Sequence, residues 1–147
     1  MNMHIFKHTI WIDRPREAVF DYFTDFSKAS EWRQYVRAME PADAGRVRAG
    51  SRVHVTMDLS GDEYAFDLEV LVCERPSLWR HRTNETDFRG FIEYRFDEER
   101  GGTRVTLSFV AKPVGLYGWL AAPLVWMRGG KSYREQLPRL KHMMEAA

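Results

Sequence analysis

The sequence has only one cysteine, Cys73, among its 147 residues, so an internal disulfide and a metal site built from several cysteines are both excluded. No apolar run reaches the roughly 18 residues that would cross a bilayer. The N-terminus also lacks the basic-then-apolar pattern of a secretory signal. We therefore expect a cytoplasmic protein without stable membrane insertion.

Sites with a recognisable sequence signature are absent as well. The histidines at positions 4, 8, 54, 81 and 142 do not have the spacing of metal ligands, and the chain has no glycine-rich phosphate loop and no nucleophile elbow. The formal net charge is +1, from 22 Lys and Arg against 21 Asp and Glu, and the basic residues form no stripe. The sequence thus predicts no metal, no organic cofactor and no nucleic-acid partner.

The composition is that of one folded unit. Apolar residues make up 44% of the chain and aromatic residues 14%, and the length is close to that of a typical domain. No internal repeat, low-complexity tract or Gly/Ser/Pro linker interrupts it. We expect a single domain over residues 1–147.

The N-terminal quarter has the pattern of one strand followed by two short helices. Residues 6–12 are rich in β-branched and aromatic side chains, and period two places Phe6, His8, Ile10 and Ile12 on one face, which is typical of a strand. Pro15 and Glu17 then favour a helix start, and Ser27 is a candidate cap for a second short helix that runs toward Trp32.

From residue 50 the apolar residues recur with period two, which predicts a series of hairpin-linked antiparallel strands. A further strand around Val36–Met39 would raise the total from six strands to seven. Beyond Pro113 the spacing changes to three and four residues, which predicts one long C-terminal helix. Pro123 and Pro138 each remove a helical donor, so this helix is expected to be kinked or to begin only after Pro123.

Five local motifs follow one another in this frame. They are the strand-to-helix transition with its proline at residues 12–20, Trp32 in the second helix, the turn at residues 74–79 in which Arg75 replaces a proline, the hairpin Gly101-Gly102-Thr103, and the ending Leu137 to Glu145. Together with the element order they resemble the START / birch-pollen-allergen-like (SRPBCC) superfamily and its polyketide cyclase/dehydrase-like branch. The resemblance covers nearly the whole chain. It implies an α+β helix-grip fold, in which a curved antiparallel sheet of six to seven strands wraps around a long C-terminal helix.

The resemblance also implies a deep cavity between the sheet and that helix. The alternation places an almost wholly apolar set of side chains on the concave face, which suits a hydrophobic ligand, although a filled core would have the same pattern. The expected function is binding of a hydrophobic small molecule, such as a lipid, polyketide or quinone, for transport, sequestration or sensing. The candidate ligand-binding residues are Phe66, Leu68, Trp79, His81, Ile92, Tyr94, Leu107, Phe109, Trp126 and Tyr133.

Two polar residues on the same face are the candidates for chemistry. His81 and Tyr94 lie on consecutive predicted strands with the parity of apolar neighbours, so they point inward, whereas His54 has the parity of the polar face. In one alternative, a cyclase or dehydratase without cofactor uses His81 or Tyr94 as acid/base. A core histidine that a neighbour satisfies is the structural alternative. A third function class is a protein-interaction module, associated with a chaperone or ribosome.

Overall fold

A seven-stranded antiparallel sheet forms most of the fold in the computed structural model, which describes residues 3–43, 45–59, 61–83, 88–113 and 134–146 together with Leu116 and Leu120. The chain begins with β1 (Met3–Ile12), followed by α1 (Arg16–Thr24), the 3-10 helix η1 (Phe26–Lys28) and α2 (Ala29–Trp32). The other strands are β2 (Val36–Pro41), β3 (Arg52–Leu59), β4 (Asp62–Glu74), β5 (Leu78–Thr83), β6 (Phe88–Glu99) and β7 (Gly102–Pro113). Residues 134–146 form the C-terminal helix.

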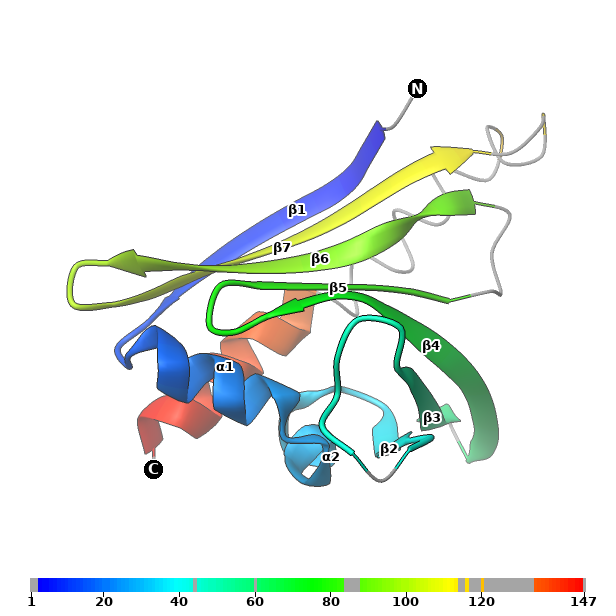
Figure 1. The fold of residues 1–147 in the computed structure, drawn as a ribbon, viewed down its shortest axis with the longest axis horizontal. Coiled ribbons are helices and arrows are strands. Elements are labelled where there is room, and N and C mark those ends of the chain that lie inside the picture. Colours follow the sequence, from blue (N-terminus) through cyan, green and yellow to red (C-terminus); the bar gives the residue numbers. More distant parts are fainter. Residues whose placement is uncertain are drawn as a thin grey trace.

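The strand order is β1-β7-β6-β5-β4-β3-β2, so β1 and β2 lie at opposite edges of the sheet although only the short helices separate them in the chain. α1, α2 and the C-terminal helix all lie on one side of the sheet (Figure 1). This arrangement confirms the predicted α+β fold, and β2 is the seventh strand expected around Val36–Met39. No described helix is long and apolar enough to cross a membrane.

The register of β4 differs from the prediction at one point. Strict alternation would place Val72 on the same face as Val70. A β-bulge follows Val70, which pairs with His81, and beyond it Cys73 lies opposite Trp79. The extra residue reverses the parity of the strand, so Cys73 takes the inward position that the alternation predicts for Val72.

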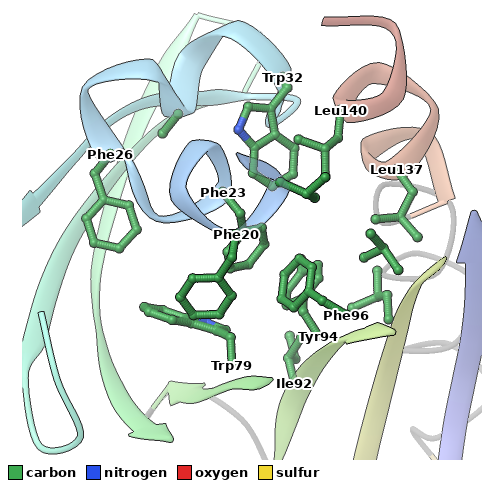
Figure 2. Close-up of a cluster of buried hydrophobic side chains, with 14 of the residues drawn as sticks. Phe20, Phe23, Phe26, Trp32, Trp79, Ile92, Tyr94, Phe96, Leu137 and Leu140 are labelled. Atoms are coloured by element: carbon green, nitrogen blue, oxygen red, sulfur yellow. The ribbon is translucent and has the colours of Figure 1, made fainter. Parts of the chain in front are cut away.

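The core lies between the sheet and the helices, and Phe23 of α1 is at its centre (Figure 2). The Phe23 ring centroid is 4.5 Å from that of Tyr94, 5.3 Å from Phe96, 5.5 Å from Trp32 and 5.7 Å from Trp79. Leu137 and Leu140 of the C-terminal helix are fully buried in the same cluster. One aromatic side chain thus connects α1, α2, β5 and β6.

The second short helical segment is not capped by the predicted residue. The side chain of Asp25 accepts a hydrogen bond from the backbone N–H of Ser27, and the Ser27 hydroxyl donates to the same carboxylate. A carboxylate two residues earlier in the chain therefore satisfies the free N–H group at the start of η1. Ser27 is the donor in this cap and not the acceptor.

The end of the C-terminal helix is attached to the corner between β1 and α1. Lys141 Nζ donates to the Trp11 carbonyl oxygen at 2.7 Å and to Glu145 Oε2 at 2.8 Å. Glu145 Oε2 also accepts from the backbone N–H of Asp13 at 2.9 Å. Of the predicted long helix, residues 134–146 are helical and include Pro138, whereas Trp119 and Pro123 lie outside the described residues.

Candidate functional site

Four buried polar side chains lie on the inner side of the fold, and we call them the interior polar cluster. They are Arg33 directly after α2, His81 on β5, Tyr94 on β6 and Gln136 on the C-terminal helix. Their exposed fractions are 6%, 5%, 0% and 7%. Elements from distant parts of the sequence therefore bring a cation, an imidazole, a phenol and an amide into one apolar interior.

His81 is held as a neutral imidazole. Trp79 occupies the previous inward position of β5, and its indole Nε1 donates to His81 Nδ1 at 2.8 Å. Burial, and secondarily the positive charge of Arg33, lowers the pKa of His81 to about 3. Because Nδ1 accepts a hydrogen bond and the ring is neutral, the ring proton is on Nε2. His81 thus offers its neighbours an N–H donor.

Tyr94 connects the sheet to the C-terminal helix. Its hydroxyl donates to Gln136 Oε1 at 2.9 Å, and its ring lies 6.4 Å from the His81 ring between centroids. Burial raises the pKa of Tyr94, while the charge of Arg33 and a hydrogen bond with it act in the opposite direction. The phenol is therefore protonated at neutral pH and sits beside a cation.

Arg33 is placed by the end of α2. Its backbone N–H donates to the Ala29 carbonyl oxygen at 2.9 Å, which closes the helix immediately after the buried Trp32. The guanidinium carbon lies 4.3 Å from the Trp32 ring centroid and 4.8 Å from that of Phe23. Stacking on aromatic faces stabilises a guanidinium away from water, because this cation is weakly hydrated and planar.

The candidate residues of the sequence analysis divide into three groups. His81 and Tyr94 point inward as predicted, and His54 is on the solvent side, where its Nδ1 lies 2.8 Å from Asp67 Oδ1. Trp126 and Tyr133 lie outside the described residues. The remaining candidates belong to the core or pack against it: Leu68, Trp79, Ile92 and Leu107 are buried, and Phe66 and Phe109 are half-buried.

Arg33 and Gln136 are not among the candidate residues predicted from the sequence. Gln136 had a detectable signal, because it is four residues before Leu140 and eight before Met144, and therefore lies on their buried helical face. Arg33 had none of this kind, since an arginine beyond a short helix is usually solvated.

A separate hollow lies between α1, η1, the end of β2 and the segment that precedes β3. It has a volume of about 720 Å³, and its walls include Phe20, Phe26, Met39, Cys73 and three arginines, Arg46, Arg48 and Arg75. Burial raises the pKa of the Cys73 thiol, against a smaller opposite effect of Arg46. The thiol is therefore a weak nucleophile at neutral pH. Within the described ranges no three His, Cys, Asp or Glu side chains are grouped to hold a metal ion.

The sequence and the fold both have counterparts among known proteins. The family described as "Polyketide cyclase / dehydrase and lipid transport" matches residues 3–145. No curated protein sequence matches significantly.

Solved structures share the fold at low sequence identity. The protein TTHA0849 from Thermus thermophilus is 21% identical, with a TM-score of 0.72 over 99% of this chain and 98% of that chain. A START superfamily protein from Mycobacterium smegmatis is 13% identical, with a TM-score of 0.72 over 98% and 99% of the two chains. The di-domain ARO/CYC BexL is 15% identical, with a TM-score of 0.75 over 96% of this chain and 49% of that chain. The family match shows that this chain belongs to the polyketide cyclase/dehydrase and lipid transport family, and the solved structures show that it has the fold of a START superfamily protein.

Proposed function

We propose that the protein binds a hydrophobic small molecule between the sheet and the C-terminal helix, with the interior polar cluster in contact with the polar end of the ligand. The observation that carries this proposal is the convergence of Arg33, His81, Tyr94 and Gln136 inside an otherwise apolar interior. Small-molecule sites have this composition, because apolar walls supply affinity and a few polar groups fix orientation. The family description, which names cyclases and lipid transport, is consistent with such a ligand.

The apolar body of the ligand would contact side chains that face inward without being fully covered. Phe66 of β4 and Phe109 of β7 are half-buried and pack at the margin of the core. Phe109 also stacks on Phe6 of β1, with ring centroids 5.6 Å apart. Trp126 and Tyr133 remain proposed members of the same wall.

Binding of the dye ANS to the native protein, and its displacement by apolar competitors, tests the proposal. Native mass spectrometry of freshly purified protein would identify a ligand that is retained from the cell. We expect His81→Ala and Tyr94→Phe to weaken ligand binding by about 1–3 kcal/mol each, through loss of a buried hydrogen bond. His54→Ala, on the solvent side of the sheet, is the matched control and should bind as the wild type does.

Two results would contradict the proposal. One is a native protein that binds neither ANS nor any apolar competitor. The other is unchanged affinity in both His81→Ala and Tyr94→Phe, which would make these residues polar members of a filled core.

Cyclase or dehydratase chemistry is the second candidate, and the family description favours it. The two candidate acid/base residues are not equally suited to it. A histidine whose pKa is lowered to about 3 is a weak base at neutral pH, and its Nδ1 is already engaged by Trp79. Tyr94 is therefore the remaining candidate proton donor, and its hydroxyl would have to turn from Gln136 Oε1 toward a substrate carbonyl.

Conversion of a poly-β-keto thioester to a cyclised or dehydrated product, followed by mass spectrometry, tests this candidate. We expect Tyr94→Phe to lower turnover by about 10²- to 10⁴-fold, as for a lost general acid. His81→Gln, which keeps an acceptor for Trp79, should have a much smaller effect. Absence of any product from the wild-type protein would leave binding as the function.

A further inference from the structure

We propose that the hollow between α1, η1, the end of β2 and the segment before β3 is a second binding site, which takes a small organic anion with an apolar body, such as an aromatic carboxylate. Its volume of about 720 Å³ is within the range of small-molecule sites. None of the four side chains of the interior polar cluster lines it. The proposal therefore goes beyond the function proposed above and does not depend on it.

Part of the wall of the hollow is apolar. Phe20 of α1, Phe26 of η1 and Met39 of β2 line it, although only 2%, 8% and 6% of their surfaces are exposed. The ring of Phe20 packs on Phe96, with centroids 5.2 Å apart, and that of Phe26 packs on Trp79, at 5.9 Å. These two rings thus lie between the hollow and the core, and they offer the apolar body of a ligand a surface held in place by the core.

Two carboxylates along the wall are already bound by other groups of the chain. Both oxygens of Asp21 accept hydrogen bonds from Arg75, at 2.8 and 2.9 Å. Asp25 Oδ1 accepts from the backbone N–H and from the hydroxyl of Ser27. The pair of Asp21 and Arg75 therefore adds no net charge to the hollow, and Asp25 serves as the cap of η1.

The segment before β3 contributes two arginines that are not bound in this way. The side chains of Arg46 and Arg48 line the hollow and form no hydrogen bond or ion pair with any other residue that the structure describes. Among the carboxylates of the wall, only Glu40 is equally unengaged within the described ranges. Two positive charges and one negative charge thus remain for a ligand. A carboxylate complements this excess, because a guanidinium binds it through two parallel hydrogen bonds.

The charge of Arg46 acts on two walls of the hollow. Hydrogen bonding to Arg75 lowers the pKa of Asp21, and Arg46 adds an effect in the same direction. Burial raises the pKa of Cys73, and Arg46 opposes this rise. Asp21 lies on α1 and Cys73 at the end of β4, and both line the hollow. An anion placed between them and Arg46 would be stabilised by the same charge.

Cys73 provides a local readout, because it is the only cysteine of the chain and lines the hollow. A ligand in the hollow should slow the alkylation of Cys73 by uncharged iodoacetamide, which mass spectrometry follows. 2-Naphthoate and 2-naphthamide are the matched ligands, since they share the apolar body and differ in charge. We expect naphthoate to protect Cys73 at a concentration at least about tenfold lower than naphthamide, because charge-assisted bonds are stronger than neutral ones. Isothermal titration calorimetry should give the same ratio of affinities.

Variants of the two arginines assign the preference. Arg46→Met should remove most of it, Arg46→Lys should recover part of it, and the double variant with Arg48→Met should bind both ligands equally. Each alkylation rate is compared with and without ligand in the same variant, because loss of Arg46 also changes the pKa of Cys73. Arg37→Met is the matched control and should keep the wild-type preference, since Arg37 is exposed on β2 and pairs with Glu63 at 3.1 Å.

Three results would overturn the inference and leave the proposed function intact. The first is equal affinity of the wild-type protein for the two ligands, or no binding of either. The second is an unchanged preference in the double variant. The third is naphthoate that binds without protecting Cys73, or that displaces the uncharged interior probe N-phenylnaphthylamine over the concentration range in which it protects Cys73.

Discussion

Trp79 and His81 occupy successive inward positions on β5, and their hydrogen bond together with burial keeps the His81 imidazole neutral. A single outward residue separates them, so the indole N–H of Trp79 can reach the imidazole of His81. This bond satisfies the hydrogen-bonding capacity of His81 Nδ1. Protonation of His81 would break this bond and place a second cation beside Arg33. The neutral form is therefore part of the folded state.

This charge state predicts a pH dependence of stability. The folded pKa of His81, about 3, is below its ordinary value of 6.5, so between these pH values the unfolded chain binds a proton that the folded chain does not. The free energy of unfolding should fall as the pH falls from 6.5 toward 3, by up to about 1.4 kcal/mol per pH unit. Urea denaturation at several pH values measures this slope.

His81→Gln should make that slope shallower, because glutamine accepts from Trp79 without titrating. The lowered pKa of His8 adds a contribution of the same sign to both proteins, so the difference between them reports His81 alone. Identical slopes in His81→Gln and wild type would show that His81 is not neutral in the folded protein.

Gly102 stands where the end of β1 leaves no room for a side chain. A Cβ at this position would meet the carbonyl oxygen of Ile12 and come within 2.8 Å of the Trp11 indole. We expect Gly102→Ala to destabilise the protein by about 1–3 kcal/mol, because the backbone of β1 cannot move away without breaking its pairing with β7. The urea midpoint measures this effect, and Gly45→Ala, with open space around it, should stay within about 0.5 kcal/mol.

At the residue level, parity in the sequence was sufficient to predict the inward positions of His81 and Tyr94 and the outward position of His54. It failed at Val72, because a bulge adds one backbone residue without a sequence signal that single-strand alternation can detect. It also missed Arg33, whose burial depends on aromatic rings that tertiary packing brings to it.

At the level of elements, the C-terminal helix is held by charged and polar contacts as well as by its apolar face. Lys141 donates to a backbone carbonyl of β1, pairs with Glu145 and lies 5.3 Å from the Trp11 ring centroid. The contact is only partly shielded, so we expect Lys141→Met to lower the free energy of unfolding by about 1 kcal/mol. Arg139→Met, on the exposed face of the same helix, should change it by less than about 0.5 kcal/mol.

Chemical denaturation of the two variants side by side is the measurement. Equal stabilities would mean that the helix is held by Leu137, Leu140 and Met144 alone. The sequence predicted this helix from its periodicity and the short helices from their caps and spacing. It did not predict Asp25 as the cap of η1, because Ser27 and Asp25 are both strong capping residues and only the backbone path distinguishes them.

At the level of the whole molecule, the aromatic contacts of Phe23 unite α1, α2 and the sheet in one core. We propose that residues 1–147 fold as one domain, and Phe23→Ala tests this. The substitution should lower the free energy of unfolding by about 3–5 kcal/mol. Tryptophan fluorescence and far-UV circular dichroism should lose their signals together in urea, whereas separate transitions would indicate independently stable parts. Tyr22→Phe, which removes only the exposed bond to Glu31, is the neighbouring control.

The overall fold was predictable because the order of elements and the turn motifs are local properties of the sequence. The polar composition of the interior was only half predictable, since His81 and Tyr94 lie on regular strands, whereas Arg33 and Gln136 reach the same point from helix ends. Local patterns determine which face a residue occupies. They do not determine which distant residues share that face.

The strand order also has a consequence for how the chain acquires its structure. Within this sheet β1 is synthesised before the other strands, but its partner β7 begins at Gly102, so β1 stays unpaired until synthesis has passed β7. Pairing over such a sequence distance is slow, because the loop entropy is lost before the contacts form. The sheet can therefore grow by successive hairpins from β2 to β7. In the last stage β1 pairs with β7, and the C-terminal helix then docks at the corner between β1 and α1. Nascent chains shorter than this would expose the apolar face of β1, and this is the stage at which we expect them to need protection from aggregation.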